Sequence, residues 1–161
     1  MTLLLYRIDD RLIHGQVVVG WGQPLDVGFI VLVDDAVAAS DWEQELYRMG
    51  VPPNMQVYFH TAADVVPELP RYRSDPRRGI LLTGSVDTMR RIAEQAGIDA
   101  VNVGGLHARA GRVQRLRYVF LSPDEEQELR DLAARGVRVT AQDVPGARPV
   151  SLDHLLAGIE E

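Results

Sequence analysis

The chain has 161 residues, 46% hydrophobic and 25% charged, which is typical of one globular domain with a substantial core. It contains no cysteine, which excludes disulfides and thiol chemistry, and its formal net charge of −6 argues against a nucleic-acid partner. All 17 basic residues are arginines, so no lysine can form a Schiff base or serve as the phosphate ligand of a Walker-type loop.

The N-terminal segment, Met1 to Arg7, lacks the basic start of a signal peptide, and its apolar run is too short for one. No stretch of the sequence approaches the roughly 18 apolar residues that are needed to span a bilayer. We therefore expect a cytoplasmic protein without direct membrane insertion, which would be peripheral at the inner membrane only through partner subunits.

Apolar strand-like runs alternate with amphipathic helical stretches along the chain, as in an α/β domain. The pattern predicts strands at Thr2–Arg7, Phe29–Val33, Val57–Phe59, Ile80–Leu82, Ala100–Val103, Tyr118–Leu121 and Val137–Ala141. It predicts helices from near His14 through Trp21, and at Ser40–Met49, Thr61–Leu69, Ser85–Ala96, Ser122–Gly136 and Ser151–Gly158. The remaining polar segments are predicted to be a loop at Arg71–Arg78 and a hairpin-like excursion at His107–Arg117.

These elements predict one α/β domain over residues 1–161, with an open, mostly parallel sheet of about seven strands and helices on both faces. The unbroken apolar run Phe29–Val33 is typical of a strand that is buried on both faces. Pro67 and Pro70 are expected to bound the third helix. The connection after Gly105 is too short for a crossover helix, so we expect one antiparallel strand near the sixth or seventh.

The most informative stretch is the run from Arg7 to Val17, where a short strand passes into a helix near His14. A helix N-terminus presents unpaired backbone N–H groups and a partial positive charge, which together favour phosphate binding. The same field disfavours imidazolium and favours the neutral, nucleophilic form of His14. The run therefore suggests a histidine that receives a phosphoryl group, although a polar loop residue or a helix cap would produce the same pattern.

The run Arg7-Ile8-Asp9-Asp10-Arg11-Leu12-Ile13-His14-Gly15-Gln16-Val17 resembles the signature R-x-D-D-R-L-x-H-G-Q-V. That signature belongs to the enzyme IIB proteins of the mannose/fructose/sorbose family of the bacterial sugar phosphotransferase system (PTS). A second match is Val101-Asn102-Val103-Gly104-Gly105-Leu106, where the family typically has V-N-V-G-G-M. The resemblance implies a phosphotransferase component that takes a phosphoryl group from phospho-IIA onto Nδ1 of His14. It also implies transfer to a sugar imported through membrane IIC and IID subunits, without a metal or organic cofactor.

Three residues are expected to act directly in that chemistry. His14 would be the nucleophile, and Arg11 would pair with the phosphoryl oxygens through its guanidinium. Asp9 or Asp10 would orient Arg11 or the imidazole. Backbone N–H groups of Gly15 and Gln16 would complete a phosphate cradle. Arg7 would either bind phosphate or hold the shape of the loop.

Further candidates lie where predicted strands end, because ligands of open α/β sheets bind at the carboxyl ends of the strands. The residues expected to line the site there are Asp10, Asp34, Thr83, Ser85, Gly104 and Gly105. Each also has a purely structural interpretation: Asp34, Thr83 and Ser85 as helix caps, Asp10 as a solvated turn residue, and the glycines as a tight turn.

The other charged residues suggest no metal site. His60, His107 and His154 lack the spacing of metal ligands, and only His107, which follows the glycine pair, is expected to touch a partner. The arginine groups Arg71–Arg78 and Arg109–Arg117 are either solvated faces or a docking rim for an acidic protein. Two alternative functions remain at this point: a regulatory phosphoacceptor that is not coupled to transport, and a non-covalent anion-binding module.

Overall fold

The structure is a computed structural model that describes residues 3–158, so Thr2 of the first predicted strand and the ends of the predicted domain 1–161 lie outside the described residues. The strands are β1 (Leu3–Ile8), β2 (Val27–Val33), β3 (Gln56–His60), β4 (Arg78–Thr83), β5 (Ala100–Val103), β6 (Val113–Leu116), β7 (Val119–Leu121), β8 (Arg138–Ala141) and β9 (Val150–Ser151). The helices are the π-helix η1 (Gln16–Gly22) and the α-helices α1 (Asp35–Ala38), α2 (Asp41–Met49), α3 (Ala62–Arg73), α4 (Val86–Gln95), α5 (Pro123–Ala134) and α6 (Leu152–Ala157).

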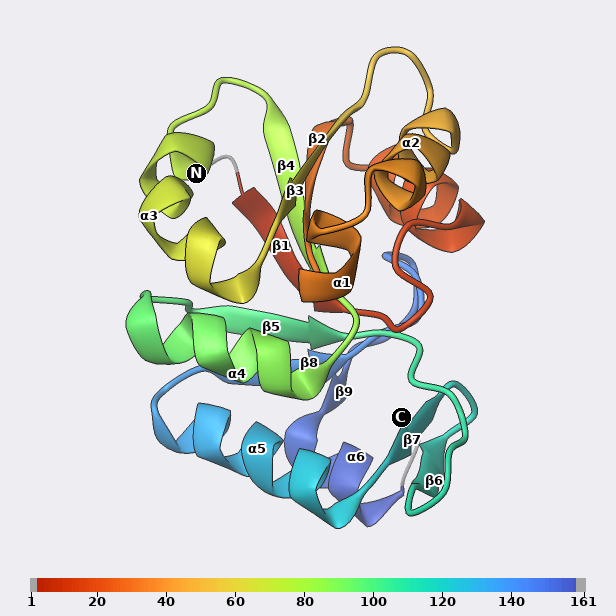
Figure 1. Cartoon of the computed structure of the whole chain (residues 1–161). Coiled ribbons are helices and arrows are strands. Elements are labelled where there is room, and N and C mark those ends of the chain that lie inside the picture. The colour runs from red at the N-terminus through yellow and green to blue at the C-terminus, as the bar shows by residue number, and fades with distance from the viewer. Residues whose placement is uncertain (1–2, 159–161) are drawn as a thin grey trace.

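The main sheet has seven strands in the order β3-β2-β4-β1-β5-β8-β9. Every neighbouring pair is parallel except β8 and β9, which are antiparallel. The first strand of the chain, β1, therefore lies in the middle of the sheet, between β4 and β5 (Figure 1). The predicted open, mostly parallel sheet of about seven strands is confirmed.

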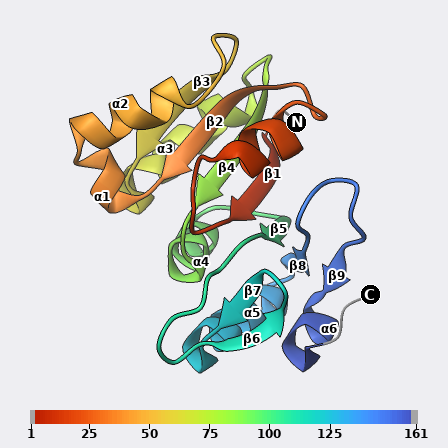
Figure 2. The ribbon, with the colours of Figure 1, turned by 90° about the vertical axis from the view of Figure 1, so that its right-hand side faces the viewer.

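Two apolar cores lie on opposite faces of this sheet, so the prediction of helices on both faces is also confirmed (Figure 2). The larger core joins the sheet to α3, α4, α5 and α6 through buried residues such as Leu69, Met89 and Leu129. The smaller core joins it to η1 and α1, where Val17 and Val37 are buried. The burial of these faces, rather than intrinsic helix propensity, holds the short helices in place.

The strand β2 shows how the sequence produces this two-sided burial. Its alternate residues Phe29, Val31 and Val33 belong to the larger core, and Ile30 and Leu32 belong to the smaller one. Successive side chains of a strand point to opposite faces, so an uninterrupted apolar run is required when both faces are covered. The prediction that this strand is buried on both faces is confirmed.

The predicted sixth strand, Tyr118–Leu121, forms, but it does not belong to the main sheet. It becomes β7, which pairs antiparallel with β6 in a separate two-stranded sheet, while the unpredicted β9 completes the main sheet as its antiparallel strand. The short connection after Gly105 cannot return the chain to the main sheet, and the hairpin instead buries Leu116, Val119 and Leu121 in the larger core. The expected hairpin-like excursion is therefore present, with its strands at β6 and β7.

The helix α3 continues past its predicted end at Leu69, although Pro67 and Pro70 lie inside it. Each proline removes one N–H donor from the helix, but the buried face that includes Tyr72 supplies enough packing to outweigh this loss. The predicted loop Arg71–Arg78 is correspondingly shorter, because its first residues belong to α3 and its last residue begins β4.

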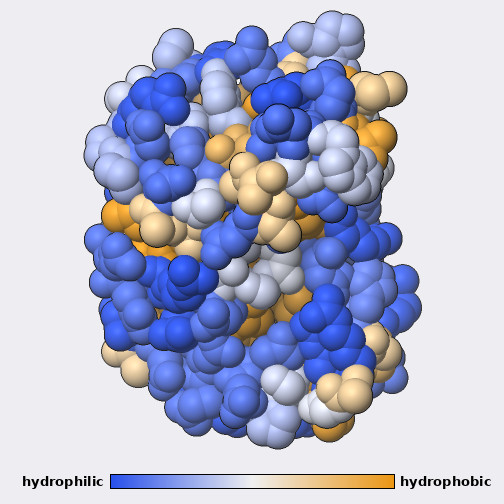
Figure 3. All heavy atoms as spheres, viewed as in Figure 1, coloured by the Kyte–Doolittle hydropathy of each residue, from blue (hydrophilic) through white to orange (hydrophobic). Residues whose placement is uncertain are grey.

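The surface of the molecule is mostly polar on the side seen in Figure 3, where hydrophobic residues form small, separate groups. The large hydrophobic side chains that are exposed within the described residues are Leu4, Val19, Trp42, Leu46, Met49 and Val113. No helix within residues 3–158 has the length and hydropathy that a membrane crossing needs.

The histidine at the end of β3 lies in surroundings that favour its neutral form. Nε2 of His60 lies 2.6 Å from the hydroxyl of Tyr72, and Nη2 of Arg71 donates to the same hydroxyl at 3.0 Å. Arginine can only donate, so the hydroxyl accepts from Arg71 and remains able to donate its own proton to a neutral His60. Burial lowers the pKa of His60; Arg71 also lowers it, while Glu68 and Asp64 oppose the shift.

We predict that His60 makes the protein less stable in acid. Because its pKa is lower in the folded state, the unfolded state binds the proton more readily, and the free energy of unfolding falls as the pH drops through the ordinary value of about 6.5. The substitution His60→Gln keeps an acceptor for Tyr72 but does not titrate. Urea unfolding at about pH 7.5 and pH 5 should therefore show a smaller acid loss in this variant than in the wild type.

The matched control is His154→Gln, because His154 is an exposed histidine on the distant helix α6. This variant should retain the acid sensitivity of the wild type. The same pH dependence in wild type and His60→Gln would contradict the prediction.

Candidate functional site

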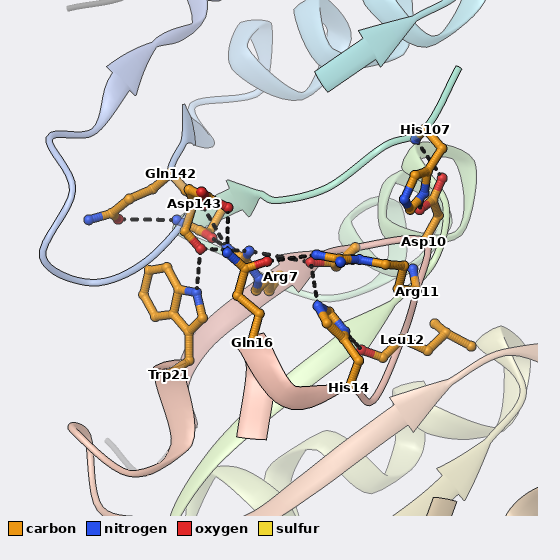
Figure 4. Close-up of polar contacts among 12 residues, drawn as sticks. Arg7, Asp10, Arg11, Leu12, His14, Gln16, Trp21, His107, Gln142 and Asp143 are labelled. Atoms are coloured by element: carbon orange, nitrogen blue, oxygen red, sulfur yellow. Dashed lines mark hydrogen bonds and ion pairs between the residues drawn. The ribbon is translucent and has the colours of Figure 1, made fainter. Parts of the chain in front are cut away.

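The loops that follow β1, β4, β5 and β8 meet at one edge of the main sheet (Figure 4). Backbone hydrogen bonds join them: the N–H of Asp9 donates to the carbonyl of Thr83 at 2.9 Å, and the N–H of Asp10 donates to the carbonyl of Gly105 at 2.9 Å. The carboxyl ends of these parallel strands are thus brought together, as the sequence predicted for an open α/β sheet. The loop after β1 lies in the middle of this edge.

Asp9 is the centre of the site. Its side chain is fully buried, and Oδ1 accepts a hydrogen bond from the backbone N–H of Arg11 at 3.2 Å. Oδ2 lies 3.4 Å from Nη2 of Arg7 and 3.8 Å from Nε2 of His14, and Oδ1 lies 3.9 Å from Nε of Arg11. One carboxylate therefore touches all three basic side chains of the predicted run, which supports the expected orienting role of Asp9.

Arg7 does not lie where it could bind a phosphoryl group at the surface. Its side chain is fully buried, and its guanidinium donates to Oδ1 of Asn102, to the carbonyl of Gln142 at 2.9 Å and to the carbonyl of Asp143 at 3.2 Å. Its carbon Cζ lies 4.8 Å from the ring centroid of Trp21. Of its two predicted roles, the geometry therefore supports the second, to hold the shape of the loop, over phosphate binding.

Burial lowers the pKa of the Arg7 guanidinium, and the neighbouring carboxylates of Asp9 and Asp143 oppose this shift. A charge so deeply buried needs partners on every side, because an uncompensated buried ion is strongly destabilising. Gly104 provides part of the necessary space, since a Cβ at this position would lie 2.3 Å from Nη2 of Arg7. Gly104 is thus required by the approach of Arg7.

His14 is held against the backbone of its own loop. Its Nδ1 lies 2.8 Å from the carbonyl oxygen of Leu12, which can only accept, so Nδ1 carries a hydrogen. Leu12 has a left-handed backbone, with φ of 58°, and this conformation turns the carbonyl toward the ring. Nε2 is buried without a hydrogen-bond partner in the described part of the chain, while the side chain as a whole is 18% exposed.

Arg11 lies beside His14 at the surface, and its side chain is 45% exposed. Its Nη2 donates to Oε1 of Gln16 at 2.6 Å, while Nε faces the buried carboxylate of Asp9. Gly15 and Gln16 begin the first turn of η1, where backbone N–H groups have no partner within the helix. The predicted helix is present but is a π-helix of seven residues, a form often found at functional sites.

Asp10 points away from His14. Its carboxylate accepts from Nδ1 and from the backbone N–H of His107, and Oδ2 lies 3.4 Å from Nη1 of Arg112 (Figure 4). The prediction that Asp10 lines the site is therefore not supported by its position. Nor is it the solvated turn residue of the alternative interpretation, because its side chain is only 4% exposed and ties the β5–β6 loop to the end of β1.

The other predicted lining residues have structural contacts. Oδ1 of Asp34 accepts from the N–H of Val37 and caps α1, and Oγ of Ser85 accepts from the N–H of Thr88 and caps α4. Thr83 is buried and contributes its carbonyl to the loop after β1. Within residues 3–158, no hydrogen bond or ion pair joins any of these three side chains to His14 or Arg11, and the contacts that they do make fit the structural interpretation. Gly105 lies near it, since a Cβ there would be 3.8 Å from Nη2 of Arg11.

Sequence reasoning missed four residues that support the site from a distance along the chain. Oδ1 of Asp143 accepts from Nε2 of Gln16 at 2.7 Å, and the Asp143 carbonyl accepts from Nε1 of Trp21 at 3.0 Å. Asn102 and Gln142 contact Arg7. Only Asn102 carried a signal, because it lies inside the second family motif; nothing in the local pattern marks the segment after β8.

In this arrangement the imidazole of His14 and the partly exposed guanidinium of Arg11 lie against one buried carboxylate, that of Asp9. No group of three or more His, Cys, Asp or Glu side chains within residues 3–158 is placed to hold a metal ion. A histidine beside an exposed arginine at the carboxyl edge of a parallel sheet can take up a phosphoryl group covalently. The fold and the site thus define the class: an α/β phosphoryl carrier.

The sequence comparisons identify the family within this class. Residues 3–161 match the family model described as the PTS system sorbose subfamily IIB component. The chain is 36% identical over 151 residues to the N-acetylgalactosamine-specific phosphotransferase enzyme IIB component 1 of Escherichia coli K12, with 90% of this chain and 92% of that protein covered. It is 34% identical over 149 residues to the sorbose-specific EIIB component of Klebsiella pneumoniae, with 89% and 90% covered.

A third relative is longer. The mannose-specific EIIAB component of Escherichia coli K12 is 30% identical over 163 residues, which cover all of this chain but 50% of that protein. Among solved structures, the IIB domain of the Klebsiella pneumoniae sorbose permease superimposes with a TM-score of 0.87 at 29% identity, covering 98% of each chain. The Escherichia coli N-acetylgalactosamine-specific IIB component 1 has a TM-score of 0.85 at 32% identity and covers 92% of this chain and 98% of that one.

The chain therefore belongs to the sorbose-subfamily IIB components of the bacterial sugar phosphotransferase system. It is a phosphotransferase component, and its general role is that of a phosphocarrier in sugar transport. The resemblance drawn from the two sequence motifs is confirmed. The regulatory phosphoacceptor and the non-covalent anion-binding module are not favoured, because the relatives are named as components of sugar-specific systems.

We predict that Arg7→Met lowers the free energy of unfolding by about 3 kcal/mol, because it leaves the buried Asp9 carboxylate without its charged partner. The double variant Arg7→Met/Asp9→Asn should recover part of this loss, since the uncompensated charge is then absent. Urea unfolding measures both. The control Arg135→Met removes the half-exposed pair with Glu94 and should cost less than about 1 kcal/mol. A loss for Arg7→Met no larger than that of the control would contradict the prediction.

Proposed function

We propose that His14 is the residue that carries the phosphoryl group. It would accept the group from a phosphohistidine of a IIA protein and pass it to a sugar that enters through IIC and IID subunits. The observation that supports this most directly is that His14 and the exposed Arg11 lie against the same buried carboxylate, that of Asp9. Residues 1–161 would act as one IIB domain.

The chemistry is two successive displacements at phosphorus. In the first, the lone pair of a His14 ring nitrogen forms a P–N bond while the P–N bond of the donor phosphohistidine breaks, and that electron pair returns to the donor imidazole. In the second, a sugar hydroxyl oxygen attacks the phosphorus, the P–N bond to His14 breaks with its electron pair returning to the imidazole, and the hydroxyl proton restores the neutral ring. Neither displacement needs an oxidant or a reductant.

The imidazole of His14 has to turn before the first displacement. Nδ1, the nitrogen that the family resemblance implies, carries the hydrogen that the Leu12 carbonyl accepts, and Nε2 is buried. A nitrogen without a free, accessible lone pair cannot attack phosphorus. Release of the ring from the Leu12 carbonyl, with transfer of the ring proton from Nδ1 to Nε2 through solvent, would make Nδ1 the nucleophile of a neutral imidazole.

Arg11 would supply the positive charge for the transferred group. Its guanidinium can donate two parallel hydrogen bonds to phosphoryl oxygens, and it lies at the surface where a donor protein can approach. The backbone N–H groups of Gly15 and Gln16 would add neutral donors. Asp9 would keep both basic side chains on the same side of the loop.

A basic rim surrounds the site on a chain whose overall charge is negative. Besides Arg11, it includes the exposed side chains of His107, Arg109 and Arg117. We propose that this rim receives an acidic surface of the IIA donor, where rim charges mainly accelerate association. The EIIAB name of the Escherichia coli mannose relative supports a IIA partner. In this proposal the chain acts in the cytoplasm, at membrane-bound IIC and IID subunits.

We predict one acid-labile phosphoryl group on the wild-type chain after incubation with phosphoenolpyruvate, the general PTS proteins and a mannose-family IIA protein. Intact-mass analysis at alkaline pH should detect it, and acidification should remove it, since phosphohistidine is stable only in alkali. His14→Ala should remain unmodified, whereas His154→Ala should be modified like the wild type. Modification of His14→Ala, or none of the wild type beside a demonstrably charged IIA protein, would refute the proposal.

We further predict that Arg11→Gln slows this phosphorylation by about 100-fold, the scale expected when a charge-stabilising donor is removed from a reaction site. Rapid-quench measurement of the rate at saturating phospho-IIA tests it. Arg135→Gln, which changes an exposed arginine on the far side of the main sheet, should leave the rate within about twofold of the wild type. Equal rates for the two variants would exclude Arg11 from the reaction.

A further inference from the structure

A carboxylate from the C-terminal part of the chain reaches the loop of His14. Asp143 directly follows Gln142 in the segment between β8 and β9, and its Oδ1 accepts from Nε2 of Gln16 at 2.7 Å (Figure 4). Its own position is fixed by the backbone, because the Asp143 carbonyl accepts from Arg7 at 3.2 Å and from Trp21 at 3.0 Å. The Asp143 side chain therefore reaches Gln16 from a backbone position that these two hydrogen bonds fix.

This contact decides which way the Gln16 amide faces. A carboxylate can only accept hydrogen bonds, so the NH₂ group of the amide must point to Asp143 and the oxygen must point the other way. That oxygen, Oε1, accepts from Nη2 of Arg11 at 2.6 Å. With the amide turned over, an NH₂ group would face the guanidinium, and two donors would oppose each other.

The guanidinium of Arg11 is thus held from two directions. Asp9 faces Nε at 3.9 Å and Gln16 accepts from Nη2. Within residues 3–158, Nη1 has neither a hydrogen bond nor an ion pair, so this is the edge left for an incoming anion. Arg11 is nearly half exposed, and such a side chain loses much rotational freedom when it is ordered. Prior ordering by Asp9 and Gln16 would remove part of that cost from the reaction.

We propose that Asp143 is a positioning residue for phosphoryl transfer, which acts by fixing the Gln16 amide so that its oxygen holds Arg11 toward the group on His14. This inference rests on the proposed function of His14 and Arg11 and deepens it. Asp143 does not touch the phosphoryl group. Its effect on Arg11 passes through Gln16, whereas its other oxygen, Oδ2, accepts from Nη2 of Arg117 at 3.2 Å.

The test is the rate of single-turnover phosphorylation by phospho-IIA, measured by rapid quench over a range of donor concentrations. Asp143→Asn keeps the shape of the side chain but offers Gln16 a donor as well as an acceptor, so the amide is no longer fixed. We expect the rate at saturating donor to fall about tenfold, the equivalent of about one hydrogen bond, with the half-saturating donor concentration unchanged.

A cycle with Gln16→Ala separates positioning from a general structural role. If Asp143 acts through Gln16, Asp143→Asn should have less than about a twofold effect in the Gln16→Ala background, where there is no amide to orient. Removal of a negative charge near an anion would by itself speed the reaction, so slowing in the wild-type background alone points to orientation.

A second pair tests the direction of the hydrogen bond. Gln16→Glu places two carboxylates against each other and should be slow. In Gln16→Glu/Asp143→Asn, the new amide at position 143 donates to one oxygen of the new carboxylate and leaves the other oxygen for Arg11. The double variant should therefore be faster than Gln16→Glu alone, although Asp143→Asn is slower than the wild type. A lesion of the fold would not be rescued in this way.

The matched control is Asp131→Asn, which alters the same type of contact on α5, where Nε2 of Gln127 donates to Asp131 at 2.9 Å. It should react like the wild type. A wild-type rate for Asp143→Asn, or equal slowing in the Gln16→Ala background, would overturn the inference and leave the proposed function intact. Failure of the wild-type chain to accept any phosphoryl group from charged IIA would overturn both.

Discussion

The buried ion pair between Arg7 and Asp9 is the interaction on which the rest of the site depends. Neither side chain reaches solvent, and the two lie two residues apart on the central strand and the loop that follows it. Moving charges out of water costs several kcal/mol for each ion, and only dense hydrogen bonding offsets this. The guanidinium therefore determines its surroundings: a glycine at position 104, the amide of Asn102 and two carbonyls of the β8–β9 segment.

This pair explains why a reactive loop can be both exposed and ordered. Asp9 pairs with the buried Arg7 on its inner side, and its carboxylate faces His14 and Arg11 on the side toward solvent. The strand order places β1 between β4 and β5, so loops from both sides enclose it, and β8 lies one strand further. A ligand site at the point where the strand order changes direction follows from this topology. The side chains of His14 and Arg11 then lie against a carboxylate whose position is fixed by burial.

The fold could be predicted from the sequence largely because its strands are buried on both faces. Phe29–Val33 is such a strand, and Ser122 with Pro123 marks a helix start that the structure confirms as α5. The extension of α3 past Pro70 was not predictable, since it depends on a buried face that only the assembled sheet provides. For the same reason the pairing of β7 with β6 could not be read from the pattern of either strand.

The site was predicted as far as local sequence reaches. His14, Arg11 and Asp9 come from one short run, and their proximity follows from it. The burial of Arg7 could not be predicted, because it depends on Asn102 and Gln142, which are 95 and 135 residues away along the chain. Asp143 was missed for the same reason, since its contact with Gln16 spans 127 residues. Hydrogen bonds of this range leave no periodic signal in a sequence.

The distance between Arg7 and its partners also has a consequence for biosynthesis. Arg7 leaves the ribosome well before Asp143, whose carbonyl it needs and which follows 136 residues later. Contacts so remote in sequence form late in folding, because the intervening chain must first be closed into a loop. A nascent chain that contains only β1 to β4 would therefore hold Arg7 on an edge strand, with Asp9 present but without Asn102 and the two carbonyls of the β8–β9 segment. The contacts that hold Arg7 are complete only when the segment between β8 and β9 has been made.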